Sequence, residues 1–583
     1  MRKGIFVWLM AALSLVARAQ QPATAVPAPE PRIGSITGRV LTDDGQPLVK
    51  ARVSVYKLGA KQPEFFNLTT DAEGAFAAHS LTPGVYSAAA SMPAYVTPDE
   101  QNANAHLRLG AFVTLTLSQG GVITGSVYDE SGAALVRANV FAYRLRTLTG
   151  AALNPAGDNA NDTTTDDRGV YRFYGLPSGS YRMSAKSRIG QDQLPTYYPS
   201  TSRAAATEIT VNAGSETGAI DIRLRKELGL TISGTVTGAK EGGLMSHTSV
   251  TARNLNTKMP EGETEATKEN TFVLRGLTDG DYELRATTEA FQAFGAEKAG
   301  LQAASSFVRV SIRGASVSGV TLRMNSVASL KGRLTLEKTD KPTATATGTA
   351  IGTAADKCSA VSSLLAEAAI TAHSTDSKAA SNDQSGNQSG DQSGNQGLAV
   401  PNEQGEFTLR PLEAGQYHLR FDLPAPTWYV RTIAGLVGPA VGKAAPLPSD
   451  QFTLKPGQAL DNIVATIAGN AARLQGRVSA IKGARLRIHL VPADTAQAED
   501  LLRYDETLAA SDGTFQFDHI APGKYWLLAQ AVAANEPLET QRRLQVWDNA
   551  ARKQLRKDAE LAAVVFEARP CSVNKDFKLE AKK

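Results

Sequence analysis

Residues 166–181 read DDRGVYRFYGLPSGSY, and the spacing of four residues in this stretch recurs along the chain. Tyr171 is followed by Leu176, then by Gly179, and then by Tyr181. The same offsets occur in four other copies: Phe76, Leu81, Gly84 and Tyr86; Phe272, Leu277, Gly280 and Tyr282; Phe407, Leu412, Gly415 and Tyr417; Phe515, Ile520, Gly523 and Tyr525. Identical offsets in all copies indicate an internal structural repeat.

Two further elements accompany each copy. A glycine lies two residues before the aromatic residue in four copies, and Asn270 takes its place in the third, so this position is expected to be left-handed. A short apolar-x-Gly-x-apolar segment precedes each copy, with its glycine at Gly38, Gly125, Gly234, Gly332 or Gly476. The fourth copy is lengthened by the stretch 374–397, which contains QSGNQSGDQSGNQ and is interpreted as a disordered insertion.

The pattern within each unit predicts short strands. Residues 36–40 (ITGRV) alternate with a period of two, as half-buried strands do, and Gly, Pro and Asp residues mark turns between such segments. Six or seven strands per unit are typical of an antiparallel sandwich. We expect the repeated aromatic residue and Leu to fill the core and the glycine to permit a positive φ. The tyrosine is expected to reach a backbone group with its hydroxyl, as in a tyrosine corner. A binding surface of five aligned tyrosines is the alternative, although each tyrosine begins a predicted inner strand.

The predicted fold class is therefore all-β, a tandem array of five seven-stranded Greek-key β-sandwich domains with one short helix near the C-terminus. We number the units 1 to 5. Their predicted bounds are 33–118, 119–227, 228–325, 326–469 (with the insertion at about 374–397) and 470–583. The helix is predicted at about 548–562, where Leu555, Ala559 and Ala562 recur at helical spacing, and we expect it to pack over a sandwich edge.

The N-terminus predicts export. Residues 1–19 combine a basic start at Arg2 and Lys3, a short apolar run and an Ala-Arg-Ala end, which is typical of a signal peptide. The apolar run is too short to span a bilayer. Residues 20–32 are rich in Ala and Pro and are interpreted as a linker. We expect a periplasmic, cell-surface or extracellular protein, with no membrane span after cleavage of the signal peptide.

Composition excludes several function classes. The 583 residues carry 61 Lys and Arg against 57 Asp and Glu, a net charge of +4. Cleavage of the signal peptide lowers it to +1, because three basic residues and no acidic ones are lost. This balance gives no reason to expect nucleic acid as a partner. Two cysteines cannot build a disulfide-rich scaffold; Cys358 and Cys571 either form one disulfide or remain two thiols.

A search for catalytic constellations finds none. The sequence has no Gly-x-Ser-x-Gly elbow, no phosphate-binding loop and no His-Glu-x-x-His motif. We therefore predict a non-enzymatic protein with no cofactor, no metal site and no catalytic residue. The remaining candidates are aromatic pairs that could stack on a sugar ring: Phe65-Phe66, Tyr197-Tyr198 and Trp428-Tyr429. The alternative is that these rings pack back onto the sandwiches.

Taken together, these motifs resemble the carboxypeptidase regulatory-like domain. Unit 2 matches best, through residues 125–132 (GSVYDESG), 138–140 (ANV), 166–171 and 176–181; units 1 and 5 match well, and units 3 and 4 match through their second halves. The resemblance implies a prealbumin-like sandwich, also grouped with starch-binding-like sandwiches. It implies no peptidase activity, since none of the seven histidines has a Glu or His three residues on. The tandem arrangement is similar to exported bacterial proteins, acidobacterial ones in particular.

These observations favour a non-enzymatic exported protein. We expect a rod of five sandwiches that serves as a surface or periplasmic scaffold, or as an adhesion or interaction module. Its partners would be other envelope proteins or a polysaccharide. The alternative function is carbohydrate binding by one or more starch-binding-like units.

Overall fold

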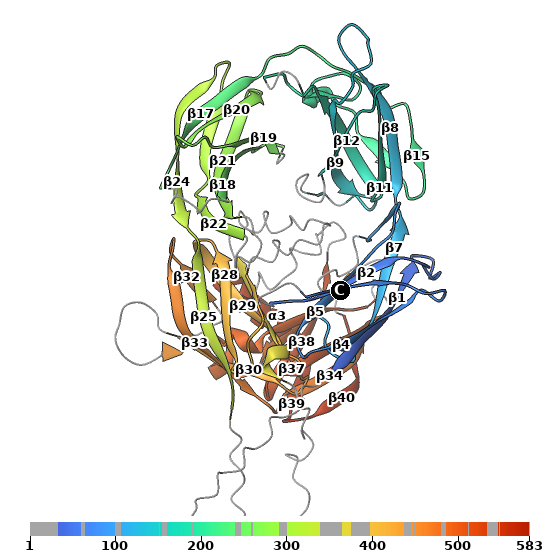
Figure 1. Cartoon of the computed structure of the whole chain (residues 1–583). Coiled ribbons are helices and arrows are strands. Elements are labelled where there is room, and N and C mark those ends of the chain that lie inside the picture. Colours follow the sequence, from blue (N-terminus) through green and yellow to red (C-terminus); the bar gives the residue numbers. More distant parts are fainter. Residues whose placement is uncertain are drawn as a thin grey trace, which may run out of the picture.

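The computed structural model describes most of residues 33–581. The exceptions are 60–63, 99–105, 151, 154–159, 189–191, 239–245, 258–259, 291–299, 338–363, 375–396, 436–444, 447–450, 480–484, 511, 533–545 and 547. The predicted signal peptide (1–19), the predicted linker (20–32) and residues 375–396 of the predicted insertion lie outside the described residues. The described chain is nearly all β and contains one α-helix, α3 (Asn549–Ala562) (Figure 1).

The apolar-x-Gly-x-apolar strand is central to the first sheet of each unit. It pairs with the strand that carries the repeated aromatic residue on one side and with a late strand on the other. These sheets run β4 (Ala75–Leu81), β1 (Gly34–Thr42), β7 (Phe112–Gln119), β6 (Tyr95–Val96) in unit 1; β11 (Val170–Leu176), β8 (Gly121–Tyr128), β15 (Glu216–Thr217), with β16 (Ile222–Arg223) also on β8, in unit 2; β20 (Thr271–Leu277), β17 (Leu230–Thr237), β24 (Val317–Ser326), β22 (Gly300–Ser305) in unit 3; β28 (Glu406–Leu412), β25 (Ala328–Leu336), β33 (Ala459–Ala468), β30 (Tyr429–Gly435), β31 (Ala445–Pro446) in unit 4; and β37 (Thr514–Ile520), β34 (Ala472–Val478), β40 (Val573–Leu579) in unit 5.

The expectation of purely antiparallel sandwiches is wrong for this first sheet. The central strand pairs in parallel with the late strand in every unit, as β1 does with β7 and β34 with β40. Seven strands that alternate in direction give the first and the last strand the same direction. When the two become neighbours, they must therefore pair in parallel.

The second sheet of each unit contains the strand that begins near the repeated tyrosine. These sheets are β3 (Phe65–Thr69), β2 (Arg52–Lys57), β5 (Tyr86–Ser91); β10 (Ala160–Thr164), β9 (Asn139–Thr147), β12 (Gly179–Lys186), β13 (Thr196–Tyr197), β14 (Ile209–Val211); β19 (Pro260–Glu265), β18 (Ser246–Asn254), β21 (Gly280–Ala290), β23 (Val308–Ile312); β27 (Leu398–Ala399), β26 (Ala369–Ser374), β29 (Gly415–Asp422), β32 (Gln451–Leu454); and β36 (Asp505–Leu508), β35 (Arg485–Pro492), β38 (Gly523–Val532), β39 (Val565–Ala568). In unit 3 the pairing of β22 with both β21 and β24 joins the two sheets.

The repeated glycine and the repeated aromatic residue form one packing unit. Gly38 lies directly opposite Phe76 in the register of β1 and β4, and a Cβ atom at residue 38 would lie 2.6 Å from Phe76 Cζ. The same opposition joins the other four pairs: Gly125 and Tyr171, Gly234 and Phe272, Gly332 and Phe407, Gly476 and Phe515. The ring fills the space that the missing side chain leaves, so two elements far apart in the sequence depend on each other.

Each unit has its own hydrophobic core between its two sheets. Five clusters of buried side chains lie within the predicted bounds of units 1 to 5, and each contains the repeated aromatic residue. The turn before that residue is left-handed as expected, with a φ of +77° at Gly169 and +58° at Asn270.

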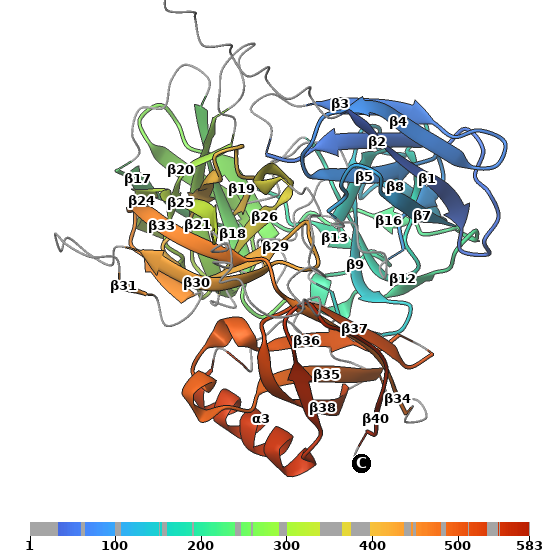
Figure 2. The same cartoon turned by 90° about the horizontal axis from the view of Figure 1, so that it is seen from below.

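Helix α3 begins where the sequence predicts it, because the Asp548 carboxylate caps it by accepting a hydrogen bond from the Ala551 N–H at 2.7 Å. The helix covers the outer face of the second sheet of unit 5, and not its edge. Leu555 and Ala559 form a separate buried cluster there with Val491 and Leu528, and Figure 2 shows α3 on the outside of this unit. Unit 5 therefore has three layers.

The units do not form a rod. In Figure 1 the blue strands of unit 1 lie at the same end of the molecule as the orange strands of unit 4, while units 2 and 3 lie at the other end. The contact between units 1 and 4 includes a hydrogen bond between His106 Nδ1 and Asp422 Oδ2 at 2.6 Å. The described chain therefore closes on itself, so the expectation of an extended array is wrong.

Candidate functional site

The five repeated tyrosines are structural and do not form a binding surface. Each side chain is at most 6 % exposed. Each hydroxyl lies within hydrogen-bond distance of the backbone carbonyl oxygen four residues earlier, at 2.6–3.0 Å: Tyr86 with Thr82, Tyr181 with Pro177, Tyr282 with Thr278, Tyr417 with Glu413, Tyr525 with Ala521. Burial raises the pKa of Tyr525 to about 12. The hydroxyl thus stays protonated and ties the preceding turn to the strand.

Three rings of the aromatic pairs are buried. Tyr197 is 5 % exposed, and Trp428 and Tyr429 are each 8 % exposed. Tyr198 packs against the core of unit 2. In the other pair, Phe65 is 43 % exposed on the edge strand β3. A ring that stacks on a sugar must expose one face, so the predicted stacking role is not the arrangement found at Tyr197, Trp428 and Tyr429.

Trp428 and Tyr429 lie at the junction of units 4 and 5. The Ala471 N–H, just before β34, donates a hydrogen bond to the Thr427 carbonyl oxygen at 2.8 Å. His519 Nδ1, in β37, lies 2.7 Å from the Trp428 carbonyl oxygen. Tyr429 packs with Ala468, Ala471 and Ala521 in a buried cluster that spans the junction. The loop before β30 therefore holds the next unit through its backbone.

The corresponding loop makes the junction of units 2 and 3. The Leu194 N–H donates to the Glu227 carbonyl oxygen at 2.8 Å, and the Gly229 N–H donates to the Asp192 carbonyl oxygen at 2.7 Å. Arg275 Nη1, at the surface of unit 3, lies 2.9 Å from Asp192 Oδ1. This is the same kind of contact, since a loop after the tyrosine strand binds the start of the next unit.

The junction of units 1 and 2 has the same kind of backbone contact, with a single hydrogen bond. The Gly120 N–H donates to the Ala94 carbonyl oxygen at 2.7 Å, and Ala94 directly precedes β6. We call these three backbone-mediated contacts the joints. Units 3 and 4 are linked differently, by an ion pair between the buried Arg285 and Glu413, with the Arg285 guanidinium 5.1 Å from the centre of the Phe307 ring.

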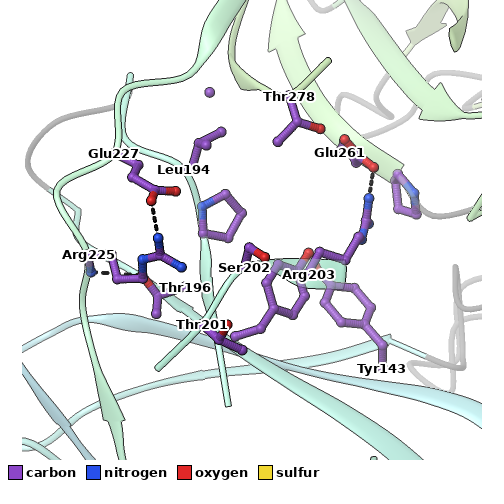
Figure 3. A pocket seen from close by; sticks show the side chains of 14 residues that line it. Tyr143, Leu194, Thr196, Thr201, Ser202, Arg203, Arg225, Glu227, Glu261 and Thr278 are labelled. Atoms are coloured by element: carbon purple, nitrogen blue, oxygen red, sulfur yellow. Dashed lines mark hydrogen bonds and ion pairs between the residues drawn. The ribbon is translucent and has the colours of Figure 1, made fainter. Parts of the chain in front are cut away.

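A cavity of about 90 Å³ lies at the joint of units 2 and 3 (Figure 3). Its wall holds an ion pair between Arg203 and Glu261, which bridges the two units, and a second pair between Arg225 and Glu227. The Tyr282 hydroxyl lies 2.7 Å from Glu261 Oε2, so this wall reaches the repeated tyrosine of unit 3. At about 30 Å³ per water molecule the cavity holds about three waters. The cavity is small and polar, and the charges of its two ion pairs cancel. It therefore suits water molecules between two units better than a larger ligand.

Other candidate chemistry is sparse in the described part of the chain. No three His, Cys, Asp or Glu side chains gather there as metal ligands would. Among the described helices, none is long and apolar enough to cross a membrane. Cys571 is disulfide-bonded, and its proposed partner Cys358 lies outside the described residues.

In the Asp-rich turn at 166–169, an Asp carboxylate accepts hydrogen bonds from the backbone of its own turn. Asp166 Oδ1 accepts hydrogen bonds from the N–H groups of Arg168 and Val170, at 2.9 and 2.8 Å. These bonds, and the one that Arg168 adds through its guanidinium, lower the pKa of Asp166. Its oxygens thus serve the turn that leads into the repeated aromatic strand.

Comparison with known proteins bears on the first two units. The family model of the carboxypeptidase regulatory-like domain matches residues 35–118 and 122–225, so the chain contains two tandem domains of this type. No curated protein matches the chain.

Several solved structures have local similarity to the chain. The Bacillus anthracis TIE protein is 17 % identical with a TM-score of 0.14, and the match covers 50 % of this chain and 50 % of that protein, so the match spans about half of its length. A streptococcal ancillary pilin is 11 % identical with a TM-score of 0.16, covering 50 % of this chain and 98 % of the pilin. The major pilin subunit BcpA of Bacillus cereus is 11 % identical with a TM-score of 0.14, covering 51 % and 100 %.

Proposed function

We propose that this chain is an exported, non-catalytic scaffold or interaction protein of the bacterial cell envelope, built from five β-sandwich units held in a fixed arrangement. The first two of these units are carboxypeptidase regulatory-like domains. The partners that such a scaffold would hold are other envelope proteins.

The observation that carries this proposal is the repeated joint. Three of the four junctions use the same device, in which a loop after the tyrosine strand accepts or donates backbone hydrogen bonds with the start of the next unit. A flexible linker would leave these groups to water and let the units turn independently. Fixed orientation between units is useful to a protein that positions partners, and it has no role in a chain that only tethers them.

The burial of Tyr197 and Tyr429 at the joints supports the same proposal. Tyr429 packs at the joint of units 4 and 5, and Tyr197 lines the joint of units 2 and 3, whereas Trp428 is buried in the core of unit 4. Carbohydrate binding, the alternative function, would need such rings at the surface. Among the described residues, the large aromatic side chains that are exposed are Phe65 and Phe112 on unit 1 and Tyr174 on unit 2.

Localisation and partner capture test the proposal together. Fractionation of cells that produce the full chain, followed by N-terminal sequencing, should give an envelope protein that begins near Gln20. A chain that stays in the cytoplasm with Met1 intact would contradict export.

Chemical crosslinking of intact cells then tests the scaffold. Wild-type chain should capture a defined set of envelope proteins, and Tyr429→Ala, which removes a side chain from the buried cluster between units 4 and 5, should change that set. Tyr174→Ala removes an exposed aromatic side chain outside the joints and serves as the matched control. A set unchanged by Tyr429→Ala would contradict a role for fixed geometry. Retention on a polysaccharide column that Tyr197→Ala abolishes would favour the alternative function.

A further inference from the structure

The contact that closes the chain joins two surfaces of opposite charge. His106 Nδ1 lies 2.6 Å from Asp422 Oδ2, and Arg108 Nη2 lies 3.1 Å from Asp422 Oδ1. The Arg108 Nε–H also donates to the backbone carbonyl oxygen of Glu367 at 2.8 Å. Unit 1 thus supplies hydrogen-bond donors and the positive charge of Arg108, and unit 4 supplies acceptors and the negative charge of Asp422, so neither surface is complementary to itself.

The charged contact holds Asp422 in its ionised form. Burial raises the pKa of this carboxyl group, but the hydrogen bond from His106 and the charge of Arg108 outweigh it, and the pKa is lowered overall. At neutral pH Asp422 therefore carries the negative charge that the contact requires.

An apolar contact lies beside the charged one. Leu58 and Val85 of unit 1 form a buried cluster with Ala369 of unit 4, and Val400 packs against it. The fit is close, since a Cβ atom at Gly59 would lie 2.7 Å from Val400 Cβ. Shape, apolar surface and charge are therefore matched between two surfaces that belong to units far apart in the sequence.

The contact is separate from the cores. The side chains of His106, Arg108 and Asp422 are 18, 22 and 36 % exposed, so their ion pairs lie at the rim of the contact, where such pairs contribute about 0–1 kcal/mol each. Units 1 and 4 have their own hydrophobic clusters. The two surfaces can therefore part without unfolding either unit when the chain bends between units 3 and 4, whose link is an ion pair and not one of the joints.

We propose that these two surfaces are an exchangeable interface, which closes one chain on itself and which also joins two copies of the chain. In the pair of copies, unit 1 of each copy binds unit 4 of the other, so both contacts form around a two-fold axis. Within one chain the tether favours self-closure, and the exchange between copies grows with concentration. This inference goes beyond the proposed scaffold function, because it gives the scaffold a means of self-association.

Charge reversal provides a direct test with the full chain. Arg108→Asp places two carboxylates opposite each other, and Asp422→Arg places two guanidinium groups opposite each other, so each variant closes on itself, or pairs with its own kind, less readily than the wild-type chain. When the two variants are mixed, Arg108 of one meets Asp422 of the other, and the two substituted residues also meet as an opposite-charge pair. One variant is isotopically labelled, and native mass spectrometry counts the species.

The expected result is a one-to-one heterodimer in the mixture and monomers in each variant alone. The dimer fraction of the mixture should exceed that of either variant severalfold, since each restored ion pair of up to about 1 kcal/mol changes the equilibrium about fivefold. The chain that carries both substitutions is the matched control, and it should close on itself and remain monomeric. Thermal unfolding checks that all three chains are folded.

The wild-type chain gives a second, independent readout. Labelled and unlabelled chains are combined at high salt, which screens the rim ion pairs, and are then returned to low salt at high protein concentration. Mixed-isotope dimers are expected, and their fraction should rise with concentration. Monomers alone in both experiments, from chains that remain folded, would overturn the proposal, and this outcome would leave export and the joints untouched.

Discussion

The Nδ1 atom of His519 lies 2.7 Å from the backbone carbonyl oxygen of Trp428, which places a side chain of unit 5 against the loop of unit 4 that carries the aromatic pair. His519 has a φ of +61°, and Ser80 occupies the equivalent position of unit 1 with the same φ. The same local bulge is therefore used in both units. In unit 5 the side chain at this bulge contacts the preceding unit.

This relationship predicts that His519→Gly separates the unfolding of unit 5 from that of unit 4. Glycine adopts the positive φ without strain, so the loss reports the missing ring and its hydrogen bond, about 1 kcal/mol. Differential scanning calorimetry of the full chain should show an earlier transition for unit 5. Ser80→Gly changes the equivalent position and should leave the profile unchanged or slightly shifted upward. Equal effects of the two substitutions would argue against the joint.

The hydrogen bond of the repeated tyrosine predicts a loss of stability within a single unit. Tyr525→Phe keeps the ring but removes the hydroxyl that donates to the Ala521 carbonyl oxygen at 2.7 Å, and leaves that buried acceptor without its partner. We expect unit 5 to lose about 1–2 kcal/mol of unfolding free energy, measured by urea denaturation. Tyr174→Phe, at a side chain that is 66 % exposed, is the control and should have no measurable effect.

The packing of glycine against the aromatic ring predicts that Gly38→Ala destabilises unit 1. The new methyl group would clash with the Val113 backbone oxygen of β7 and would lie 2.6 Å from Cζ of the Phe76 ring, in a strand held on both sides by β4 and β7. Overpacking of this kind costs about 1–3 kcal/mol. Gly218→Ala is the matched control, because the nearest atom to its new methyl group would lie 3.5 Å away. A neutral Gly38→Ala would show that both the ring and the backbone of β7 can move aside.

The repeat made much of the fold predictable from the sequence. Offsets between an aromatic residue, a leucine, a glycine and a tyrosine describe one strand, one turn and the start of the next strand, and these are local geometries. Asn270 in place of glycine carried the same information, since both residues accept a positive φ. The helical spacing of Leu555, Ala559 and Ala562 likewise predicted α3.

Contacts between units were beyond the reach of such patterns. His106 and Asp422 are 316 positions apart, and no periodicity links them. The aromatic pairs were predicted as candidates for stacking on a sugar ring. Whether such a ring is buried at a junction or exposed to a ligand depends on the neighbouring unit, and local hydrophobicity does not show this. The parallel pairing of the first and last strands also depends on which strands become neighbours, which the spacing of turns does not specify.

A last prediction concerns the pH dependence of unit 5. His489 is 2 % exposed on β35, and burial, followed by the positive charge of Arg487, lowers its pKa from 6.5 to about 4. Glu506 Oε2 lies 3.4 Å from Nδ1, and Gln530 raises the pKa slightly, but neither compensates for the loss of water. The folded unit therefore holds the neutral imidazole.

Because the pKa is lower in the folded unit than in the unfolded chain, protonation favours unfolding. The stability that the neutral form provides is fully present above pH 6.5 and is lost as the pH falls towards about 4. A shift of this size corresponds to about 3 kcal/mol. Urea denaturation of the full chain between pH 7.5 and 4, at about half-unit steps, should show unit 5 losing stability over this window. His489→Gln removes the titrating group, and its slope against pH should be smaller by about one proton. An equal slope in both chains would place the pH sensitivity elsewhere.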